Sequence, residues 1–326
     1  MKPNPKNFCG GNYNDWVEVM LTPKCNGKCA WCVDKNGFHP KEEVDWKTLA
    51  DTIIALNKRN IILLGGEPTL YRKLPELVSY LSSHNRDVYI TTNGSHMTFI
   101  GNNISKLAGL NVSIHHYDLY RNKDITGILV NFNLLERVIK YFKEDKNIHT
   151  RLNCTLINGE IDSVHEINEY IEFAKSVRAT SVRFAELKHD SKFVNLYELF
   201  GNAYGFSNNP FVNGCSTDAV LNGMPVSFRQ MCGLQTSFRP LPTDLEAFGN
   251  KKSVVYYNGV VYDGWQTKDK EIEEMKLKDK NLSVKQILEK VKSGQMTIET
   301  ANKLLEKKAQ TNASDETDRY DGSCRY

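Results

Sequence analysis

Residues 25–32 read Cys25-Asn-Gly-Lys-Cys29-Ala-Trp-Cys32, and this stretch decides how the rest of the chain is interpreted. It places three potential thiolate ligands within eight residues, close enough together to hold one metal centre. The first expected strand, over 16–21, precedes it. Eight cysteines in 326 residues are too sparse for a disulfide scaffold, so the cluster indicates a metal or redox site in a reducing compartment.

The flanking sequence alternates short β-branched runs with longer helical patterns from Asp15 to Glu186. This alternation predicts parallel strands joined by crossover helices. Six strands are expected, over 16–21, 60–64, 88–91, 111–114, 150–156 and 181–185. Helices are expected at 74–83, 130–142 and 164–177, where apolar residues recur at helical spacing.

The chemically informative residues follow the ends of these strands. The cysteine loop follows the first, Gly65-Gly66-Glu67-Pro68 the second and Thr92-Asn93-Gly94 the third, while Ser113 and His115 close the fourth. In a barrel of parallel strands, the carboxyl ends converge on one mouth. We therefore expect these residues to form one site.

The pattern changes after residue 187. We divide the chain into an N-terminal segment (1–14), a core (15–187), an extension that covers the substrate (188–308) and a disordered tail (309–326). Residues 188–242 are rich in Gly, Asn and Pro, which predicts irregular structure over the barrel mouth. Asn258-Gly259 predicts a hairpin over 254–265, and two short amphipathic helices are expected at 283–292 and 297–308.

Composition excludes several classes of protein. The 42 Lys and Arg against 39 Asp and Glu give a net charge of +3, so bulk charge does not indicate a nucleic-acid or anionic-membrane partner. The chain has no apolar run of about 18 residues, and its first ten residues are polar. We expect a cytoplasmic protein without a membrane anchor.

Three kinds of site are compatible with the cysteine loop alone. Structural zinc needs four ligands, and the fourth would have to be distant, such as Cys9. A thioredoxin-like dithiol would use Cys29 and Cys32 and leave Cys25 without a role. An iron–sulfur cubane held by three cysteines leaves one iron open for an exogenous ligand, which is a catalytic arrangement.

The Cys-x3-Cys-x2-Cys spacing, with Trp31 before the last cysteine, resembles the signature of the radical S-adenosylmethionine (radical SAM) superfamily. The resemblance implies an α/β fold with a partial (β/α)6 TIM-like barrel. It also implies that Cys25, Cys29 and Cys32 bind a [4Fe-4S] cluster whose open iron binds the amino and carboxylate groups of SAM. Reduction then yields methionine and a 5'-deoxyadenosyl radical that abstracts hydrogen from substrate.

Two further motifs resemble that family. Gly65-Gly66-Glu67-Pro68 is similar to its GGEP motif, whose backbone and acidic side chain hold the amino group of SAM. Glycines allow close backbone approach, and a carboxylate forms a charge-assisted hydrogen bond with an ammonium. Thr92 and Asn93 resemble the ending of the family's third strand. Taken alone, the first motif is equally a Gly-Pro turn and the second an Asx turn.

Ser113 matches the serine of a Ser-x-Asp pattern that relatives place near the SAM ribose. His115 departs from the acid of that pattern, so it is a candidate catalytic proton donor or substrate contact, or else a hydrogen-bonded barrel residue. His116 is expected to point away. Asn153 and Arg183 resemble the molybdopterin-pathway cyclase branch, which implies contacts with the SAM carboxylate and the adenosyl end; buried ion pairing is the alternative.

The resemblance covers about residues 15–187 and does not extend to the substrate. We expect an enzyme acting on a small metabolite or nucleotide, with a flavodoxin or ferredoxin-type electron donor. A radical SAM peptide (RiPP) maturase is the first alternative, and a non-catalytic zinc or iron–sulfur protein is the second. Cys215, Cys232 and Cys324 have no compact ligand spacing, so no second cluster is expected.

Overall fold

The computed structural model describes residues 15–32, 34, 38–187, 192–196, 198–199, 216–229 and 253–263. All of these lie in the first of two compact units, Met1–Trp265. The second unit, Gln266–Tyr326, lies outside the described residues. The two helices expected at 283–292 and 297–308 and the tail expected at 309–326 fall in this part of the sequence. Cys9, Cys215, Cys232 and Cys324 also lie outside them.

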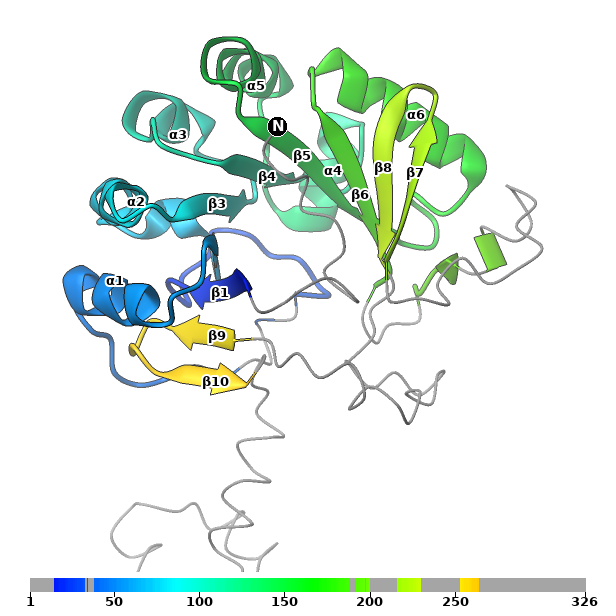
Figure 1. The fold of residues 1–326 in the computed structure, drawn as a ribbon. Coiled ribbons are helices and arrows are strands. Elements are labelled where there is room, and N and C mark those ends of the chain that lie inside the picture. Colours follow the sequence, from blue (N-terminus) through cyan, green and yellow to red (C-terminus); the bar gives the residue numbers. More distant parts are fainter. Residues whose placement is uncertain are drawn as a thin grey trace, which may run out of the picture. The chain divides into compact units, whose positions relative to one another are not determined.

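The described strands form one sheet in the order β10-β9-β1-β2-β3-β4-β5-β6-β8-β7 (Figure 1). Neighbouring strands are parallel throughout, except that β10 and β7 run antiparallel at the two edges. The two edge strands, β10 and β7, do not pair with each other, so the sheet is open. The expected partial barrel is confirmed. The strands are β1 Trp16–Met20, β2 Asn60–Leu64, β3 Asp87–Thr92, β4 Gly109–Ser113, β5 His149–Thr155, β6 Ser181–Ala185, β7 Ser216–Leu221, β8 Met224–Arg229, β9 Ser253–Tyr256 and β10 Val261–Asp263.

Helices follow the strands in alternation. They are α1 Trp46–Ala55, the 3-10 helix η3 Pro68–Leu70, α2 Leu74–Ser83, α3 Met97–Asn103, α4 Leu119–Thr126, α5 Phe132–Lys146 and α6 Val164–Ser176. The three helices expected from periodicity correspond to α2, α5 and α6. Within the described part of the chain, no helix has both the length and the apolar character needed to cross a bilayer.

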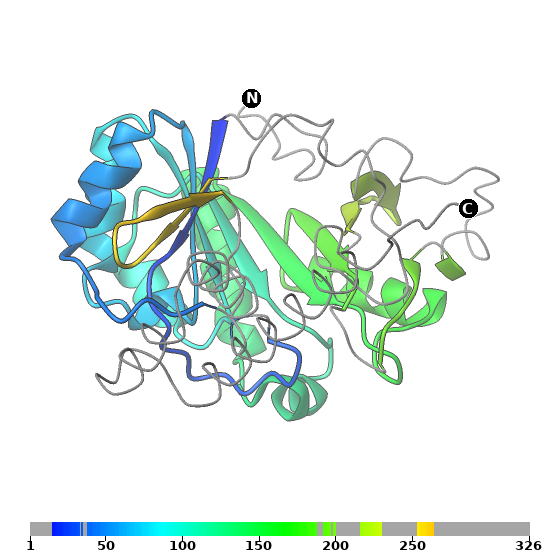
Figure 2. The same cartoon turned by 90° about the horizontal axis from the view of Figure 1, so that it is seen from below.

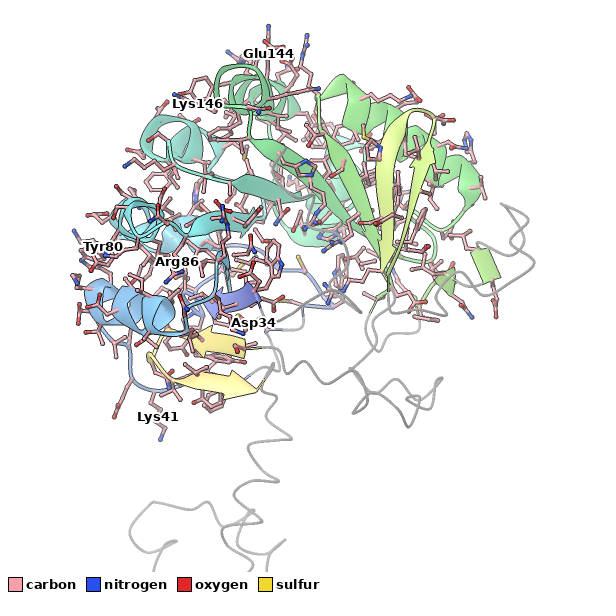
Figure 3. All side chains as sticks on the ribbon, in the orientation of Figure 1. Asp34, Lys41, Tyr80, Arg86, Glu144 and Lys146 are labelled. Carbon is pink, nitrogen blue, oxygen red and sulfur yellow. The ribbon has the colours of Figure 1, made fainter. Side chains whose placement is uncertain are left out.

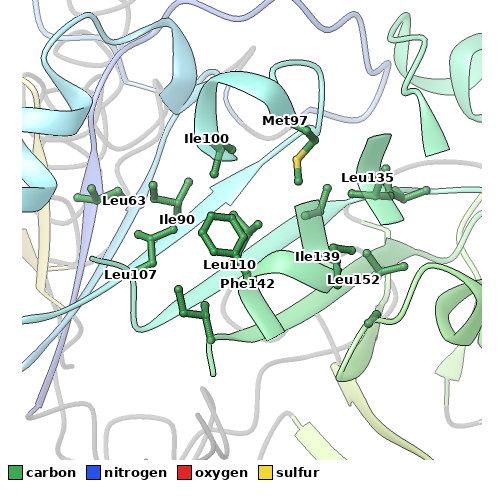
Figure 4. Packing of buried hydrophobic residues seen from close by; sticks show 14 of the residues in the cluster. Leu63, Ile90, Met97, Ile100, Leu107, Leu110, Leu135, Ile139, Phe142 and Leu152 are labelled. Carbon is green, nitrogen blue, oxygen red and sulfur yellow. The ribbon is translucent and has the colours of Figure 1, made fainter. Parts of the chain in front are cut away.

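Alternate residues of each strand point to opposite faces of the sheet, and one face carries the core. On that face, Leu63, Ile90, Leu110 and Leu152 are completely buried, and Figure 4 shows them meeting apolar side chains of α3 and α5. Burying each such side chain contributes about 1.5–3 kcal/mol. The opposite face, the inner one, is free to carry polar residues near the carboxyl ends of the strands.

The expectation of irregular structure over 188–242 is wrong for residues 216–229. Ser216–Leu221 and Met224–Arg229 form the antiparallel hairpin β7-β8, and β8 extends the sheet by pairing in parallel with β6. Its turn, Asn222 and Gly223, has positive φ angles of 49° and 77°. An Asn-Gly turn favours a hairpin because both residues tolerate positive φ. The Gly and Pro content around this turn concealed a signal that the sequence does contain.

The second expected hairpin is present. β9 and β10 pair around Asn258-Gly259, as predicted. β9 also pairs in parallel with β1, with Val17 opposite Ser253 and Met20 opposite Tyr256. A segment near residue 255 thus covers the edge of the strand that leads into the cysteine loop.

Candidate functional site

The three cysteines lie on the loop that follows β1. Cys25 is exposed, Cys29 and Cys32 are partly buried, and none of them forms a disulfide. The Cys25 sulfur accepts the backbone N–H of Gly27 at 3.3 Å, and the N–H of Cys32 donates to the carbonyl of Cys29 at 3.3 Å. Burial, the largest effect, and the nearby Glu67 and Cys32 raise the pKa of the Cys25 thiol. The free protein therefore holds protons that a bound metal would displace.

The end of α4 fixes the middle of this loop (Figure 2). The carbonyl oxygen of Thr126 accepts the N–H of Lys28 at 2.6 Å and lies 4.0 Å from the sulfur of Cys29. Carbonyls in the last turn of a helix lack partners within the helix, so they can bind a neighbouring loop. Gly127 ends the helix with φ +75°, and a Cβ there would lie 3.1 Å from Cβ of Lys28.

Gly65 and Gly66 lie against the start of the cysteine loop. A Cβ on Gly66 would lie 2.1 Å from the carbonyl oxygen of Lys24, and Gly65 has φ +101°. The N–H of Glu67 donates to the same Lys24 oxygen at 2.8 Å. The glycines are thus required for two loops to cross in contact, whether or not a ligand is present.

The carboxylate of Glu67 is completely buried and is surrounded by donors. One oxygen accepts from the N–H and hydroxyl of Thr69, at 3.0 and 2.6 Å, and from the hydroxyl of Thr92 at 2.7 Å. The other accepts the N–H of Asn93 at 2.7 Å. Glu67 therefore joins the ends of β2 and β3. Its Oε2 accepts the N–H of Asn93, and a carboxylate oxygen with one such bond can accept a second from an ammonium. Pro68 begins η3 immediately after it.

Asn93 connects this network to the cysteine loop. Its side-chain oxygen accepts the N–H of Ser95 at 2.9 Å, so the Asx turn left open by the sequence is present. Its amide nitrogen donates to Asn26 at 2.8 Å and lies 4.0 Å from the sulfur of Cys25. The turn therefore also positions a polar side chain beside a cysteine.

Asp34 is a candidate that sequence reasoning missed. It lies two residues after Cys32, and its carboxylate accepts the backbone N–H of Gly66. Burial raises the pKa of Asp34, while His39 and the Gly66 hydrogen bond oppose this effect. A half-buried carboxylate at the glycine turn is a second acceptor for a positively charged ligand, and no motif marks it in the sequence.

His115 lies beside the cysteine loop, with its ring centre 5.4 Å from that of Trp31 in an edge-on arrangement. Its Nδ1 accepts the N–H of Thr155 at 3.0 Å, which assigns the proton of the neutral ring to Nε2. Burial lowers the pKa of His115 to about 4. At neutral pH it can donate a hydrogen bond but carries no charge. His116 faces a different partner, with Nε2 3.8 Å from Glu160.

A polar row crosses the inner face of the sheet one strand at a time. Ser113 on β4 is level with Asn153 on β5, and Asn153 is level with Arg183 on β6. Arg183, which is 7% exposed, donates from Nε to the hydroxyl of Ser227 on β8 at 3.2 Å. The structure thus brings together three residues that the sequence predicted separately.

Arg151 lies beside this row, two positions before Asn153 on β5. It is 6% exposed and donates from Nε to the side-chain oxygen of Asn153 at 3.0 Å. Burial, the largest effect, and the nearby Arg229 lower the pKa of Arg151 to about 9, while Asp218 opposes them. The guanidinium stays charged at neutral pH, and the ion pairs found among the described residues do not include it.

Comparison with known proteins matches the part of the chain that carries most of these residues. The family model described as "Radical SAM superfamily" matches residues 19–174, from β1 through α6 almost to its end. Residues 19–174 are a radical SAM domain. The cofactors of this family are a [4Fe-4S] cluster and SAM.

The donor set fits such a cluster. Among the described residues, no three His, Cys, Asp or Glu side chains converge as the ligands of a single ion would. In a cubane, by contrast, each thiolate binds a different iron, so three free cysteines arranged around one loop are suitable. The described residues also supply no closed set of four ligands for structural zinc.

Curated relatives of the radical SAM domain include proteins named GTP 3',8-cyclase. A probable GTP 3',8-cyclase of Pyrococcus horikoshii is 31% identical over 50% of this chain and 53% of its own length. The GTP 3',8-cyclase of Lactiplantibacillus plantarum is 25% identical over 75% of this chain and 80% of its own length. The chain thus spans about half of the first relative and four fifths of the second.

Two solved structures share the fold. Streptococcus suis SuiB bound to its precursor peptide SuiA has a TM-score of 0.55 at 16% identity, over 77% of this chain and 59% of that one. SuiB bound to S-adenosylmethionine has a TM-score of 0.53 at 15% identity, over 78% of this chain and 63% of that one. At this identity the likeness describes the architecture alone.

Proposed function

We propose that the protein reductively cleaves SAM at a [4Fe-4S] cluster and uses the resulting 5'-deoxyadenosyl radical to abstract hydrogen from a small metabolite or nucleotide-like substrate. The observation that carries this proposal is the loop of three free cysteines, fixed between the Gly65-Gly66 turn and the end of α4. The cluster, when bound, supplies one electron that breaks the C5'–S bond of SAM and releases methionine. An oxygen-labile cluster suits a reducing cytoplasm, which is the compartment we propose.

The chain's own residues hold and orient the reactants in this proposal. The thiolates of Cys25, Cys29 and Cys32 would each bind one iron, and the backbone at Gly65-Gly66, with Asp34 and Glu67, would provide acceptors for the SAM ammonium. Asn153 and Arg183 lie on adjacent strands, where they can receive the carboxylate and the adenosyl end. Positioning and exclusion of water are the protein's contribution to such chemistry.

The test is anaerobic reconstitution with iron and sulfide, followed by reduction with dithionite in the presence of SAM. We expect a brown protein that contains about four irons per chain and forms 5'-deoxyadenosine. Iron and sulfide analysis and chromatography of the products provide the measurement. A colourless protein that binds one zinc and forms no 5'-deoxyadenosine would contradict the proposal and indicate a structural metal site.

The inner face of the sheet supports a substrate with an anionic group. Strands β5 to β8 carry Arg151, Arg183 and Arg229, and Asp218 is the one acidic residue on these four strands. Planar guanidinium groups bind phosphate and carboxylate in a bidentate manner. The cyclases named above have GTP in their names, so a nucleotide is the substrate class we favour.

Replacing Arg151 with Gln tests this substrate class. We expect Arg151→Gln to weaken GTP binding to the reconstituted, SAM-loaded protein by about 10- to 100-fold, because a buried charge-assisted contact is removed. Equilibrium dialysis measures the affinity. Arg178→Gln is the matched control, since Arg178 follows α6 and pairs with Glu136 at 2.6 Å on the surface. Equal affinities of wild type and Arg151→Gln would remove the support for an anionic substrate.

A peptide maturase remains the alternative. One solved structure of similar fold is described as bound to its precursor peptide, although the likeness concerns the fold. A short precursor-peptide gene beside this gene would favour that alternative. In that case, 5'-deoxyadenosine formation should rise on addition of the peptide and remain unchanged on addition of GTP.

A further inference from the structure

We propose that a hollow between the start of α1 and the connection from η3 to α2 binds a small zwitterion with an apolar side chain, such as a free α-amino acid. We call it the α1–α2 hollow. Its volume is about 580 Å³, and it is lined by residues 22 and 24 after β1, 43–46 at the start of α1 and 70–73 before α2. Small-molecule sites in proteins have volumes of about 300–1,000 Å³, so the hollow has a suitable size.

The α1–α2 hollow is distinct from the residues predicted to bind the cluster, SAM and the substrate. Among the described residues, its lining includes neither the three cysteines nor Glu67, and it includes no residue of β4, β5 or β6. It adjoins them through Lys24, whose carbonyl oxygen accepts the N–H of Glu67 at 2.8 Å and lies against Gly66. A ligand in the hollow would therefore contact the chain on both sides of the glycine turn without reaching the cluster.

Opposite charges line the hollow without pairing. Glu43 supplies an acidic group from the start of α1, and Lys24 and Arg72 supply basic groups from the other two segments. All three side chains are exposed, and in the part of the chain that the structure describes none of them forms an ion pair. A molecule that carries both an ammonium and a carboxylate can bridge these groups with charge-assisted hydrogen bonds.

The other two charged residues of the hollow already have partners within the protein. Asp45 caps α1, because its carboxylate accepts the N–H groups of Lys47 and Thr48 at 2.9 and 3.2 Å. Lys73 pairs with Glu76 at 2.7 Å. The hollow therefore offers a ligand one acidic and two basic groups, which favours a zwitterion over a simple cation.

Tyr71 adds a buried hydroxyl without a partner. The residue is 8% exposed and lines the hollow, and its hydroxyl has no hydrogen-bond partner among the described residues. Burial, the largest effect, and the nearby Glu43 and Asp45 raise the pKa of Tyr71 to about 12. The hydroxyl is therefore protonated at neutral pH and lies near the acidic side of the hollow. An ammonium held by Glu43 can donate to it and so satisfy a buried polar group.

The apolar part of the hollow suits an aliphatic or aromatic side chain. It consists of three partly buried residues, Val44, Trp46 and Leu70. The ring of Trp46 packs edge-on against Tyr80 of α2, with the ring centres 5.9 Å apart, and Figure 3 labels Tyr80 beside α1. An apolar lining with a few polar groups is typical of small-molecule sites.

Isothermal titration of the full-length, reconstituted protein with L-leucine, L-methionine and L-phenylalanine tests the site. Saturating SAM occupies the cluster, so an amino acid that binds there is not counted. We expect at least one of the three to bind with a Kd below about 1 mM. Arg72→Gln and Glu43→Gln should each raise that Kd about 10-fold, and Tyr71→Phe about threefold, because each removes one polar partner of the ligand.

Two analogues of leucine test whether both charges are needed. 4-Methylpentanoate lacks the ammonium, and 3-methylbutylamine lacks the carboxylate. We expect each to bind at least about 10-fold more weakly than L-leucine, because one side of the hollow then has no partner.

Lys146→Gln and Glu144→Gln are the matched controls. Both residues are exposed near the end of α5, and Figure 3 labels them on that helix, away from α1. Each substitution removes a charge of the same sign as in Arg72→Gln or Glu43→Gln. We expect both controls to bind the amino acid as wild type does. All four variants should keep the iron content and, without ligand, the melting temperature of wild type.

Three results would overturn the proposal. The first is a Kd above about 10 mM for all three amino acids. The second is binding that Arg72→Gln and Glu43→Gln leave unchanged, and the third is equal affinity for L-leucine and 4-methylpentanoate. Because no metal ligand lines the hollow, protein prepared without cluster and SAM should give the same Kd. The outcome is therefore independent of whether the protein cleaves SAM.

Discussion

Cys29→Ala is expected to abolish formation of 5'-deoxyadenosine. Three cysteines must bind three irons, and the described residues near Cys29 offer no replacement thiol, because Cys154 is buried on β5. Loss of one ligand prevents stable cluster assembly. We expect the iron content after reconstitution to fall to background and the rate of SAM cleavage to fall by at least about 1,000-fold, since no other group supplies the electron.

Cys154→Ala is the matched control for that variant. Cys154 is 1% exposed, and its sulfur lies 3.7 Å from the carbonyl oxygen of His115. Removing one buried sulfur costs about 1 kcal/mol of stability, which should lower the melting temperature slightly. We expect a full cluster and wild-type absorption. A Cys29→Ala protein that still assembled the cluster and cleaved SAM would contradict the assignment of the ligands.

Gly66→Ala is expected to have a comparable effect for a steric reason. The added methyl group would lie 2.1 Å from the carbonyl oxygen of Lys24 and 2.6 Å from its carbonyl carbon. Backbone cannot move aside as a flexible side chain can, so the loop that leads into Cys25 must shift. We expect a stability loss of about 3 kcal/mol or more, together with reduced iron content, measured by thermal unfolding and iron analysis.

Gly101→Ala separates this steric effect from a general glycine effect. Gly101 lies in α3, and a Cβ there would meet Val138 at 3.5 Å, an ordinary contact distance. Alanine is favoured over glycine within a helix by about 0.5–1 kcal/mol. We therefore expect Gly101→Ala to be as stable as wild type or more stable, with a full cluster. A Gly66→Ala protein that behaved in the same way would show that the two loops need not cross so closely.

Local pattern was sufficient to predict the parallel core. The strands at Asn60–Leu64 and Ser181–Ala185 end at the residues expected. The first is an apolar run that ends at a glycine pair, and the second alternates the buried Val182 and Phe184 with polar or small residues. α2 also has the predicted limits, Leu74–Ser83. These elements are buried on the helix side, so their periodicity directly reflects their packing.

The edges of the sheet could not be predicted in the same way. The hairpin around Asn258-Gly259 was recognised, but its pairing with β1 depends on residues more than 200 positions apart, about which local periodicity carries no information. β7 and β8 were missed because Pro225 and Gly223 read as loop residues. Pro225 lies opposite Val220 of the edge strand β7, and the pairing of β8 with β6 begins one residue later, at Val226.

The candidate site also has parts that local sequence predicts and parts that it does not. Spacing identified the three cysteines and the glycine turn as candidates, and resemblance added Asn153 and Arg183. Neither revealed that the carboxylate of Glu67 is occupied by four donors of its own chain, nor that Asp34 reaches Gly66. Both facts depend on how separate loops meet in space.

The parallel pairing of β1 with β9 has a consequence for synthesis on the ribosome. Translation proceeds from the N-terminus, so β1 emerges more than 200 residues before Ser253–Tyr256 can cover its free edge. Until then, a growing chain presents an uncovered edge strand, which is a template for aggregation, directly ahead of three free thiols. The free edge of the strand that leads into the cysteine loop is thus covered late, and chains truncated before residue 253 should be insoluble, whereas full-length chains should not.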